Sequence, residues 1–335
     1  MTNYLHKVLP PQYSHVNKVY CLLAATVFCA LPLCSTEAAA ENILKYDGTT
    51  NIHGNAKTWA AKNEYDGIDI RVTGVDGGYY TDTTEALVLN NQTLNVKGKG
   101  KFVSIINTAQ NKQIDNNGGI YAKGGSTVNF TDVDSIYIAA IAGKEGGNDS
   151  TVISAKDPGR DLTGYTNIVN ISGTTVQLIG SIDVMHSLGS VFFNRNARHT
   201  VNAALSGSDS FWYGSAIGET DERTTVNLSL ADGATWIFNA GKSTLNAGGI
   251  IRNLKLDKGV VLFADAEVWE TYRKTVIKGT DYVLANYRDH NERYSQVEIR
   301  SLTGPGGIFK MDLDWQSNNG ERQYTEKSCL LYTSP

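Results

Sequence analysis

The chain has 335 residues, of which 41% are hydrophobic and 19% are charged, and its formal net charge at pH 7 is −4. No long run of lysines or arginines occurs, which argues against the basic footprint that nucleic-acid binding requires. The chain is long enough to bury a sizeable hydrophobic core.

The first 40 residues have the order of segments found in a secretory signal peptide. Lys7 and Lys18 give a positive start, residues 19–33 are mostly apolar, and residues 38–40 are three alanines suited to cleavage. The apolar stretch is shorter than the roughly 20 residues that span a bilayer, which argues against a membrane anchor. We therefore expect residues 1–40 to direct export through the inner membrane. The mature protein would then lie at the cell surface, in the outer membrane or outside the cell.

Cysteine usage agrees with a mature protein that has no internal disulfide. Cys21, Cys29 and Cys34 fall within the predicted signal peptide, which leaves Cys329 alone in the remainder. We therefore expect burial and hydrogen bonding to hold the mature fold together.

A short motif in which apolar and polar residues alternate recurs through the mature region. In the copy at 225–230, each Thr, Asn or Ser is followed by Val or Leu. A period of two places the apolar residues on one face of a strand and the polar residues on the other. The copies lie at 93–96, 127–130, 168–172, 200–202 and 225–230, with a shorter echo at 244–246. No copy is long enough to bury itself, so we expect the copies to stack on one another as successive coils.

The distances between copies help to choose the fold. Successive motif asparagines, from Asn95 to Asn246, are 34, 41, 32, 25 and 19 residues apart. Such irregular spacing argues against leucine-rich, ankyrin and propeller repeats, which keep a fixed period. Glycine- and asparagine-rich clusters between the copies favour tight turns. We therefore predict an all-β parallel β-helix (β-solenoid) with ladders of Thr, Asn and Ser on its outer face; a β-sandwich is the alternative.

The last third of the chain resembles a known family. The residues at 226–238, which include Leu230, Ala234 and Trp236, are similar to a step near the end of pertactin-like autotransporter passengers. Residues 254–263 are similar to the next coil of that family, and residues 301–314 resemble a later glycine-containing coil. The resemblance covers about residues 225–320.

This resemblance implies a right-handed parallel β-helix that is secreted by the type V route. It divides the mature chain into a β-helix passenger at 41–225, pertactin-like C-terminal coils at 226–325 and an atypical tail at 326–335. In the family, the last coils act as a folding nucleus, and we expect large apolar residues such as Trp236 and Phe309 to make them strongly buried. The family also has a C-terminal outer-membrane β-barrel translocator, which is missing from this chain. We therefore expect a truncated sequence.

The function that we expect is non-enzymatic: adhesion or surface structure, with a ligand on a host cell or its matrix as the partner. A secreted β-helix that hydrolyses or lyses polysaccharide is the alternative, and a structural stalk without any ligand is a third possibility. Aromatic residues beside turns are the candidate ligand-facing residues, although rings that cap the core would have the same pattern. These candidates are Tyr79, Tyr80, Phe211, Trp212 and Tyr213.

Residues with catalytic or metal-binding potential are few. The pairs Asp132 and Asp134, and Asp312 and Asp314, each place two carboxylates close together, as in glycosidases, but solvated strand edges have the same pattern. The histidines of the mature region are dispersed, without the spacing of a zinc site. They are His53, His186, His199 and His290. We therefore predict no catalytic residue, no metal site and no cofactor.

Overall fold

The computed structural model describes the greater part of the predicted passenger. The described residues are 42–50, 62–74, 84–109, 117–141, 151–155, 164–184, 197–218, 222–238, 248–263, 296–310, 315–318 and 321–324. All of them belong to residues 41–335, one of the two units into which the chain divides. The predicted signal peptide at 1–40 and the tail at 326–335 lie outside the described residues.

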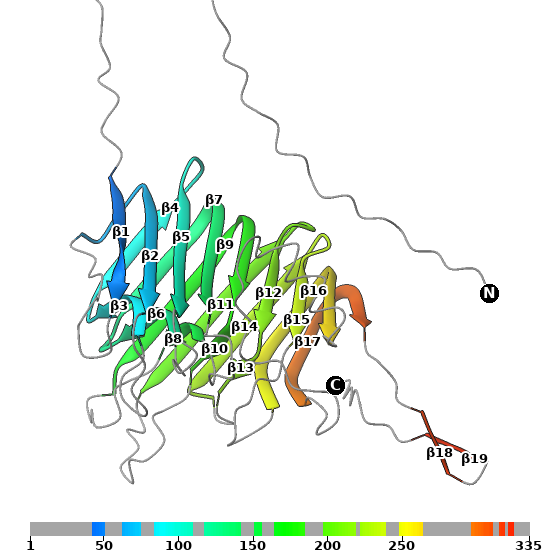
Figure 1. The fold of residues 1–335 in the computed structure, drawn as a ribbon. Coiled ribbons are helices and arrows are strands. Elements are labelled where there is room, and N and C mark those ends of the chain that lie inside the picture. The colour runs from blue at the N-terminus through cyan, green and yellow to red at the C-terminus, as the bar shows by residue number, and fades with distance from the viewer. Residues whose placement is uncertain are drawn as a thin grey trace, which may run out of the picture. The chain divides into compact units, whose positions relative to one another are not determined.

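The described part of the chain is all-β, as predicted. It contains strands and turns and no helix, so none of its elements is a helix long and apolar enough to cross a bilayer. The strands pair in parallel, except in the antiparallel hairpin of β18 (Trp315–Asn318) and β19 (Glu321–Tyr324). The parallel strands form three stacks, visible as rows of arrows in Figure 1.

The first stack, which we call the asparagine stack, contains the recurrent motif. It consists of β4 (Thr93–Lys97), β11 (Arg198–Ser206), β14 (Thr224–Ala231) and the first parts of β7 (Thr127–Ile141), β9 (Thr166–Ile179), β16 (Gly248–Phe263) and β17 (Gln296–Lys310). The middle stack consists of β1 (Ile43–Thr50), β2 (Gly67–Gly74), β5 (Phe102–Ala109), β12 (Phe211–Gly214), β15 (Thr235–Phe238) and the second parts of β7, β9, β16 and β17. The third stack consists of β3 (Thr84–Asn90), β6 (Asn117–Lys123), β8 (Thr151–Ala155), β10 (Ser181–Asp183) and β13 (Ala216–Ile217).

From β2 to β15, the described strands visit the three stacks in a constant order. After β4 it enters β5 in the middle stack and β6 in the third stack, and β7 then returns it to the asparagine stack. The strands β11, β12 and β13 repeat this order. Each strand therefore pairs in parallel with the equivalent strand one round later, as where Val201 lies opposite Val226. This arrangement is in keeping with the predicted parallel β-helix.

The corner between the asparagine stack and the middle stack is made by residues with a positive φ. Asp132 in β7 has a φ of 58°, Lys258 in β16 has a φ of 60°, and Asp232 between β14 and β15 has a φ of 51°. The pairing register shifts beside Asp132 and Lys258, so the alternation of side chains restarts after the corner. Aspartate tolerates this left-handed conformation better than most residues do.

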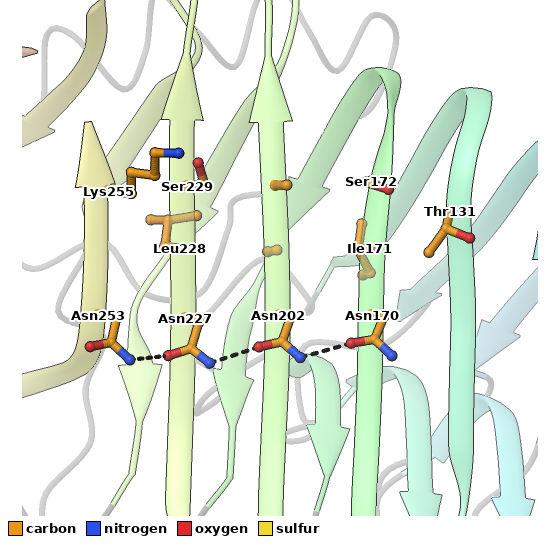
Figure 2. A pocket seen from close by; sticks show the side chains of 12 residues that line it. Thr131, Asn170, Ile171, Ser172, Asn202, Asn227, Leu228, Ser229, Asn253 and Lys255 are labelled. Atoms are coloured by element: carbon orange, nitrogen blue, oxygen red, sulfur yellow. Dashed lines mark hydrogen bonds between the residues drawn. The ribbon is translucent and has the colours of Figure 1, made fainter. Parts of the chain in front are cut away.

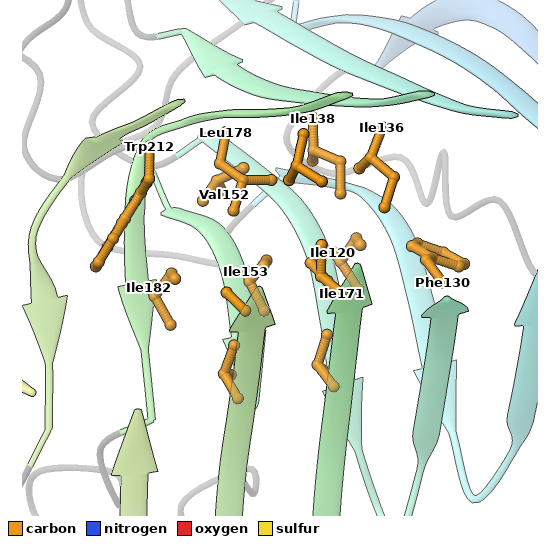
Figure 3. Close-up of a cluster of buried hydrophobic side chains, with 14 of the residues drawn as sticks. Ile120, Phe130, Ile136, Ile138, Val152, Ile153, Ile171, Leu178, Ile182 and Trp212 are labelled. Carbon is orange, nitrogen blue, oxygen red and sulfur yellow. The ribbon is translucent and has the colours of Figure 1, made fainter. Parts of the chain in front are cut away.

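The hydrophobic core lies between the stacks, and each stack contributes to it. Figure 3 shows Ile171 from the asparagine stack, Ile138 from the middle stack and Ile153 from the third stack among the clustered side chains. All three are almost completely buried. Full burial of such a side chain contributes about 1.5–3 kcal/mol relative to exposure. In β14 every second residue is buried, which confirms the alternation predicted for 225–230.

The last strand of the asparagine and middle stacks is less buried than the sequence predicts. Trp236 and Phe238 in β15 are completely or almost completely buried, in agreement with the expectation for the C-terminal coils. In β17, however, the side chain of Ile308 is 53% exposed, and Phe309 is only partly buried. The reason is topological, because β17 pairs with β16 on one side and with no other described strand.

Candidate functional site

The outer face of the asparagine stack carries a row of asparagines, one from each of six successive strands. The row consists of Asn95, Asn129, Asn170, Asn202, Asn227 and Asn253. Their neighbours along the strands point inward, as Val226 and Leu228 do with exposures of 1% and 2%, except that Arg252 beside Asn253 forms an ion pair at the surface. The motif thus places apolar residues in the core and asparagines on the surface. The predicted outer ladder is confirmed for the five asparagines from Asn95 to Asn227.

Hydrogen bonds connect the side chains of this row into an asparagine ladder. Each Nδ2 donates to the Oδ1 of the preceding asparagine, and the N–O distances from Asn129 to Asn253 are 2.9, 2.7, 2.7, 2.7 and 2.6 Å. Asn95 donates to the backbone carbonyl of Asn63 at 3.1 Å. Figure 2 shows the last four side chains of the ladder lying in one line across the strands. The ladder therefore links coils that are far apart in the sequence.

A shallow depression of about 320 Å³ lies over this part of the asparagine stack. Its lining residues come from five neighbouring strands and include four asparagines of the ladder (Figure 2). They are Thr131, Asn170, Ile171, Ser172, Asn202, Ala203, Ala204, Asn227, Leu228, Ser229, Asn253 and Lys255. This depression, which we call the ladder depression, is the candidate site. What it offers chemically is a mostly apolar accessible surface that is interrupted by amide and hydroxyl groups of the sheet.

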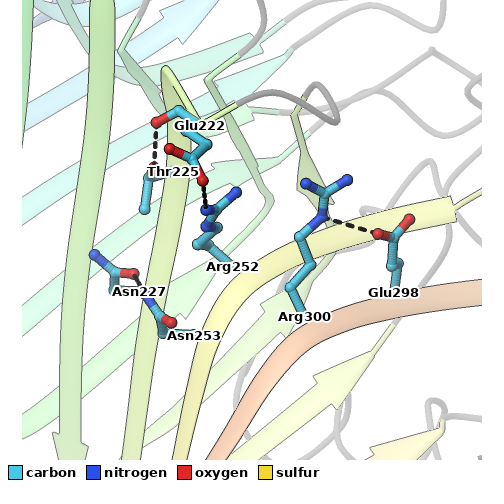
Figure 4. Close-up of polar contacts among 7 residues, drawn as sticks. All are labelled: Glu222, Thr225, Asn227, Arg252, Asn253, Glu298 and Arg300. Carbon is cyan, nitrogen blue, oxygen red and sulfur yellow. Dashed lines mark hydrogen bonds and ion pairs between the residues drawn. The ribbon is translucent and has the colours of Figure 1, made fainter. Parts of the chain in front are cut away.

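Two arginines near the end of the ladder form ion pairs with glutamates. The guanidinium of Arg252 lies 2.7 Å from a carboxylate oxygen of Glu222, and that of Arg300 lies 2.9 Å from Glu298. Figure 4 shows the first pair beside Asn227 and Asn253. Lys255 is the only charged residue among the described residues that line the ladder depression. The site is therefore close to neutral apart from one cation at its edge.

The three proposed aromatic residues that the structure describes are buried and do not form a ligand surface. Phe211, Trp212 and Tyr213 make up most of β12 and have exposures of only 6%, 0% and 3%. The Trp212 indole stacks on Trp236 with ring centres 5.2 Å apart, and its Nε1 donates to the carbonyl of Gly180 at 2.9 Å. This burial corrects the expectation, because a turn precedes these residues but their strand faces the core. Tyr79 and Tyr80 lie outside the described residues.

The first pair of carboxylates lies at a corner of the fold rather than in a cleft. Asp132 and Asp134 are exposed, and neither lines the ladder depression. Asp132 is a positive-φ residue, and Asp134 accepts a hydrogen bond from the backbone N–H of Gly100 at 3.1 Å. Both therefore have roles in the turn. The second pair, Asp312 and Asp314, lies outside the described residues.

Histidine 199 is a core residue of β11. It is completely buried, and its Nδ1 lies 3.1 Å from Nδ2 of Asn167. Asn167 also accepts hydrogen bonds through Oδ1 from the backbone N–H groups of Gly125 and Ser126, at 3.0 Å each. His53, His186 and His290 lie outside the described residues. Within the described ranges, no three His, Cys, Asp or Glu residues are grouped as metal ligands would be.

Among the described residues, two ionisable groups have a shifted pKa, and both lie away from the ladder depression. The Lys101 ammonium donates a hydrogen bond to the Asp66 carboxylate and so lowers the pKa of that carboxyl, and the backbone N–H of Asn42 adds to the effect. Burial raises the pKa of the Tyr137 phenol. These shifts follow from local structure and indicate no acid–base chemistry at the site.

The sequence motif predicts all members of the ladder except the last. The echo at 244–246 suggested Asn246 as the next copy, and this residue lies outside the described residues. The structure instead places Asn253 opposite Asn227. The signal was present, since residues 253–256 repeat the alternation of residues 227–230 with Lys255 in place of Ser229. The ladder depression itself has no sequence signature, because it depends on side chains from separate strands.

Comparisons with known proteins do not place the chain in a family. No protein-family model, no curated protein and no solved structure matches it.

Proposed function

We propose that this chain is an exported passenger of the pertactin-like autotransporter type, folded as a right-handed parallel β-helix. It acts at the cell surface without catalysing a reaction. Its asparagine stack presents a rigid, hydrogen-bonding face to a ligand on a host cell or its matrix, and an outer-membrane translocator delivers it by the type V route.

The observation that carries this proposal is the asparagine ladder with the ladder depression above it. The ladder joins six strands through side chains that point to solvent, while the apolar residues of the same strands fill the core. A face of this kind is built to hold its shape, and preorganised polar groups cost little entropy on binding. The resemblance of residues 225–320 and the signal-like residues 1–40 support the proposed route.

Hydrolysis or lysis of a polysaccharide is the competing function. Cleavage of a glycosidic bond by hydrolysis ordinarily requires two carboxyl groups on opposite sides of that bond. Among the described residues that line the ladder depression there is no carboxylate, and Asp132 and Asp134 belong to an exposed turn. Binding without cleavage is therefore the better match to the described chemistry.

The first experiment tests export. The full chain is expressed in a Gram-negative host, and the N-terminus of the product is determined by mass spectrometry after cell fractionation. The expected product begins at Glu41 and leaves the cytoplasm. A matched chain without residues 2–40 should stay inside. Recovery of an intact N-terminus in the cytoplasm from the full chain would contradict the proposal.

The second experiment separates binding from catalysis. The exported protein is incubated with cultured epithelial cells and, in parallel, with polygalacturonate and capsular polysaccharide. We expect saturable binding to cells and no release of reducing ends or unsaturated sugars. Release of either product at a rate proportional to protein concentration would favour the enzyme instead.

A further inference from the structure

Ala204 of β11 is the smallest exposed residue that lines the ladder depression. In the registers of the asparagine stack, Ala204 lies between Ser172 of β9 and Ser229 of β14, and Ser229 lies opposite Lys255. Ala204 is exposed, so its size is not dictated by the core. A methyl group among longer polar side chains leaves room above the sheet, directly beside the asparagine ladder.

The ladder leaves half of its hydrogen-bonding capacity for a ligand. A carboxamide has two N–H groups and two acceptor positions. In Asn202, the ladder uses one N–H toward Asn170 and one acceptor position toward Asn227. The same holds for Asn170 and Asn227. Each central amide therefore retains one donor and one acceptor, and these pairs repeat at the strand spacing of about 4.8 Å.

The other lining groups narrow the class of ligand. Hydroxyl groups from Thr131, Ser172 and Ser229 both donate and accept hydrogen bonds. The described lining contains no aromatic ring and no carboxylate, and Lys255 at the edge is its one charge. Carbon atoms contribute most of the accessible lining, and the amide and hydroxyl groups interrupt it from strand to strand. A strongly charged ligand would find few partners here. A neutral sugar chain presents both C–H groups and hydroxyl groups and therefore matches both parts of the lining.

We propose that the ladder depression binds a neutral, extended glycan that lies across the strands, parallel to the asparagine ladder. Successive sugar hydroxyls pair with successive amides, because one strand spacing is comparable to the length of one sugar unit in an extended chain. Ala204 leaves the space in which a ring substituent sits. This inference deepens the proposed function, on which it rests for the source of the glycan.

The test fills the depression without altering the ladder. Ala204→Gln places a longer polar side chain over the site, and Thr200→Gln is the matched control, because Thr200 lies on the same strand and outside the lining. Binding of cellohexaose and chitohexaose to the full chain is measured by isothermal titration calorimetry. We expect at least one of these neutral hexasaccharides to bind the unaltered chain and Thr200→Gln equally. We expect the affinity of Ala204→Gln for the same hexasaccharide to be lower by about tenfold or more.

A second variant protects the test against misfolding. Ser229→Gln fills the same depression from β14 and should weaken binding in the same direction. Far-ultraviolet circular dichroism and thermal melting should show all three variants folded like the unaltered chain. Lack of binding of both hexasaccharides by the folded, unaltered chain would overturn the proposal. Unchanged affinity in folded Ala204→Gln and Ser229→Gln would overturn it as well.

Acidic polysaccharide serves as the opposing probe. Binding of polygalacturonate alone, lost in Lys255→Gln, would show that charge selects the ligand and would overturn the assignment to a neutral glycan. These binding outcomes can be measured even if the protein is not exported, because they use purified protein. If instead the exported protein binds cells equally well before and after enzymatic deglycosylation of those cells, the proposed surface function stands. The assignment of a glycan as the ligand is then overturned.

Discussion

Asn202 shows how one residue type can serve both the fold and the surface. Its side chain donates to Asn170 and accepts from Asn227, each at 2.7 Å, while its backbone pairs with β9 and β14. Serine or threonine at this position could not span the strand spacing in both directions with one hydroxyl group. The amide provides a donor and an acceptor at separate atoms, which suits a ladder that runs across parallel strands.

Replacing Asn202 with alanine should therefore destabilise the protein measurably. Two hydrogen bonds are lost, each with a net contribution of about 0.5–1.5 kcal/mol, so we expect a decrease of about 1–3 kcal/mol in the free energy of unfolding. Urea denaturation measures the change. Thr200→Ala, on the same strand and outer face, is the control and should cost less. Equal losses for the two variants would show that the ladder contributes no stability of its own.

A second prediction at this scale concerns the ion pair of Asp66 and Lys101. In Lys101→Met, the pKa of the Asp66 carboxyl should rise toward its ordinary value, because the main cause of its depression is removed. A carboxyl whose pKa is lower in the folded state stabilises that state at pH values above its ordinary pKa. This stabilisation is lost as the pH falls through the pKa of the folded state. Acidification should therefore reduce stability less in Lys101→Met than in the unaltered chain. Titration followed by nuclear magnetic resonance of the carboxyl carbons measures the pKa. An unchanged pKa in Lys101→Met, with Lys99→Met as the control, would contradict the assignment.

At the level of elements, β12 and β15 show where reasoning from the sequence fails. The alternation in 225–230 predicts correctly which residues of β14 are buried, because that strand has one face on the core and one on solvent. The four residues of β12 are all buried, as are the last three of β15. A pattern of period two carries no information where both faces are covered. For this reason Phe211, Trp212 and Tyr213 looked like exposed turn residues.

The indole pair of β12 and β15 should be a major source of stability. The ring of Trp236 stacks on Trp212, lies edge-on to Phe238 with centroids 5.4 Å apart, and donates to the carbonyl of Gly214 at 3.0 Å. We expect Trp236→Ala to lower the free energy of unfolding by about 3–5 kcal/mol, because it leaves a cavity in the core. Chemical denaturation measures the loss, and Thr235→Ala on the same strand should cost far less. A loss below about 1 kcal/mol would show that the core collapses around the missing ring.

For the molecule as a whole, the sequence alone supports the all-β class, the parallel stacking and the outer ladder. These follow from repeated alternation, which is a local property, and from the inability of any single copy to bury itself. The sequence alone does not predict three features: the division into three stacks, the corner at Asp132 and the position of Ala204 beside Ser172. Each of these depends on which strands become neighbours after loops of different length, and loop length leaves no trace in a motif.

The stacks also predict an uneven distribution of local stability. The strand β17 has one described neighbour, and most of its residues are exposed, whereas β9 and β11 each lie between two strands. Backbone N–H groups of β17 should therefore exchange with solvent faster than those of β11. Hydrogen exchange followed by mass spectrometry measures both. Slower exchange in β17 would instead support the folding nucleus that the family resemblance implies for residues 226–325.

The spacing of the ladder has a practical consequence for engineering. Adjacent members of the ladder are 34, 41, 32, 25 and 26 residues apart, yet their amides meet at nearly the same distance. Chain length between them has thus been free to change while the alignment of the coils was kept, in accord with the small entropic cost of lengthening a connection. We expect the interval between Asn129 and Asn170, which is the longest of the five, to tolerate the insertion of a foreign epitope. The protein is in this sense a ready carrier for peptide display.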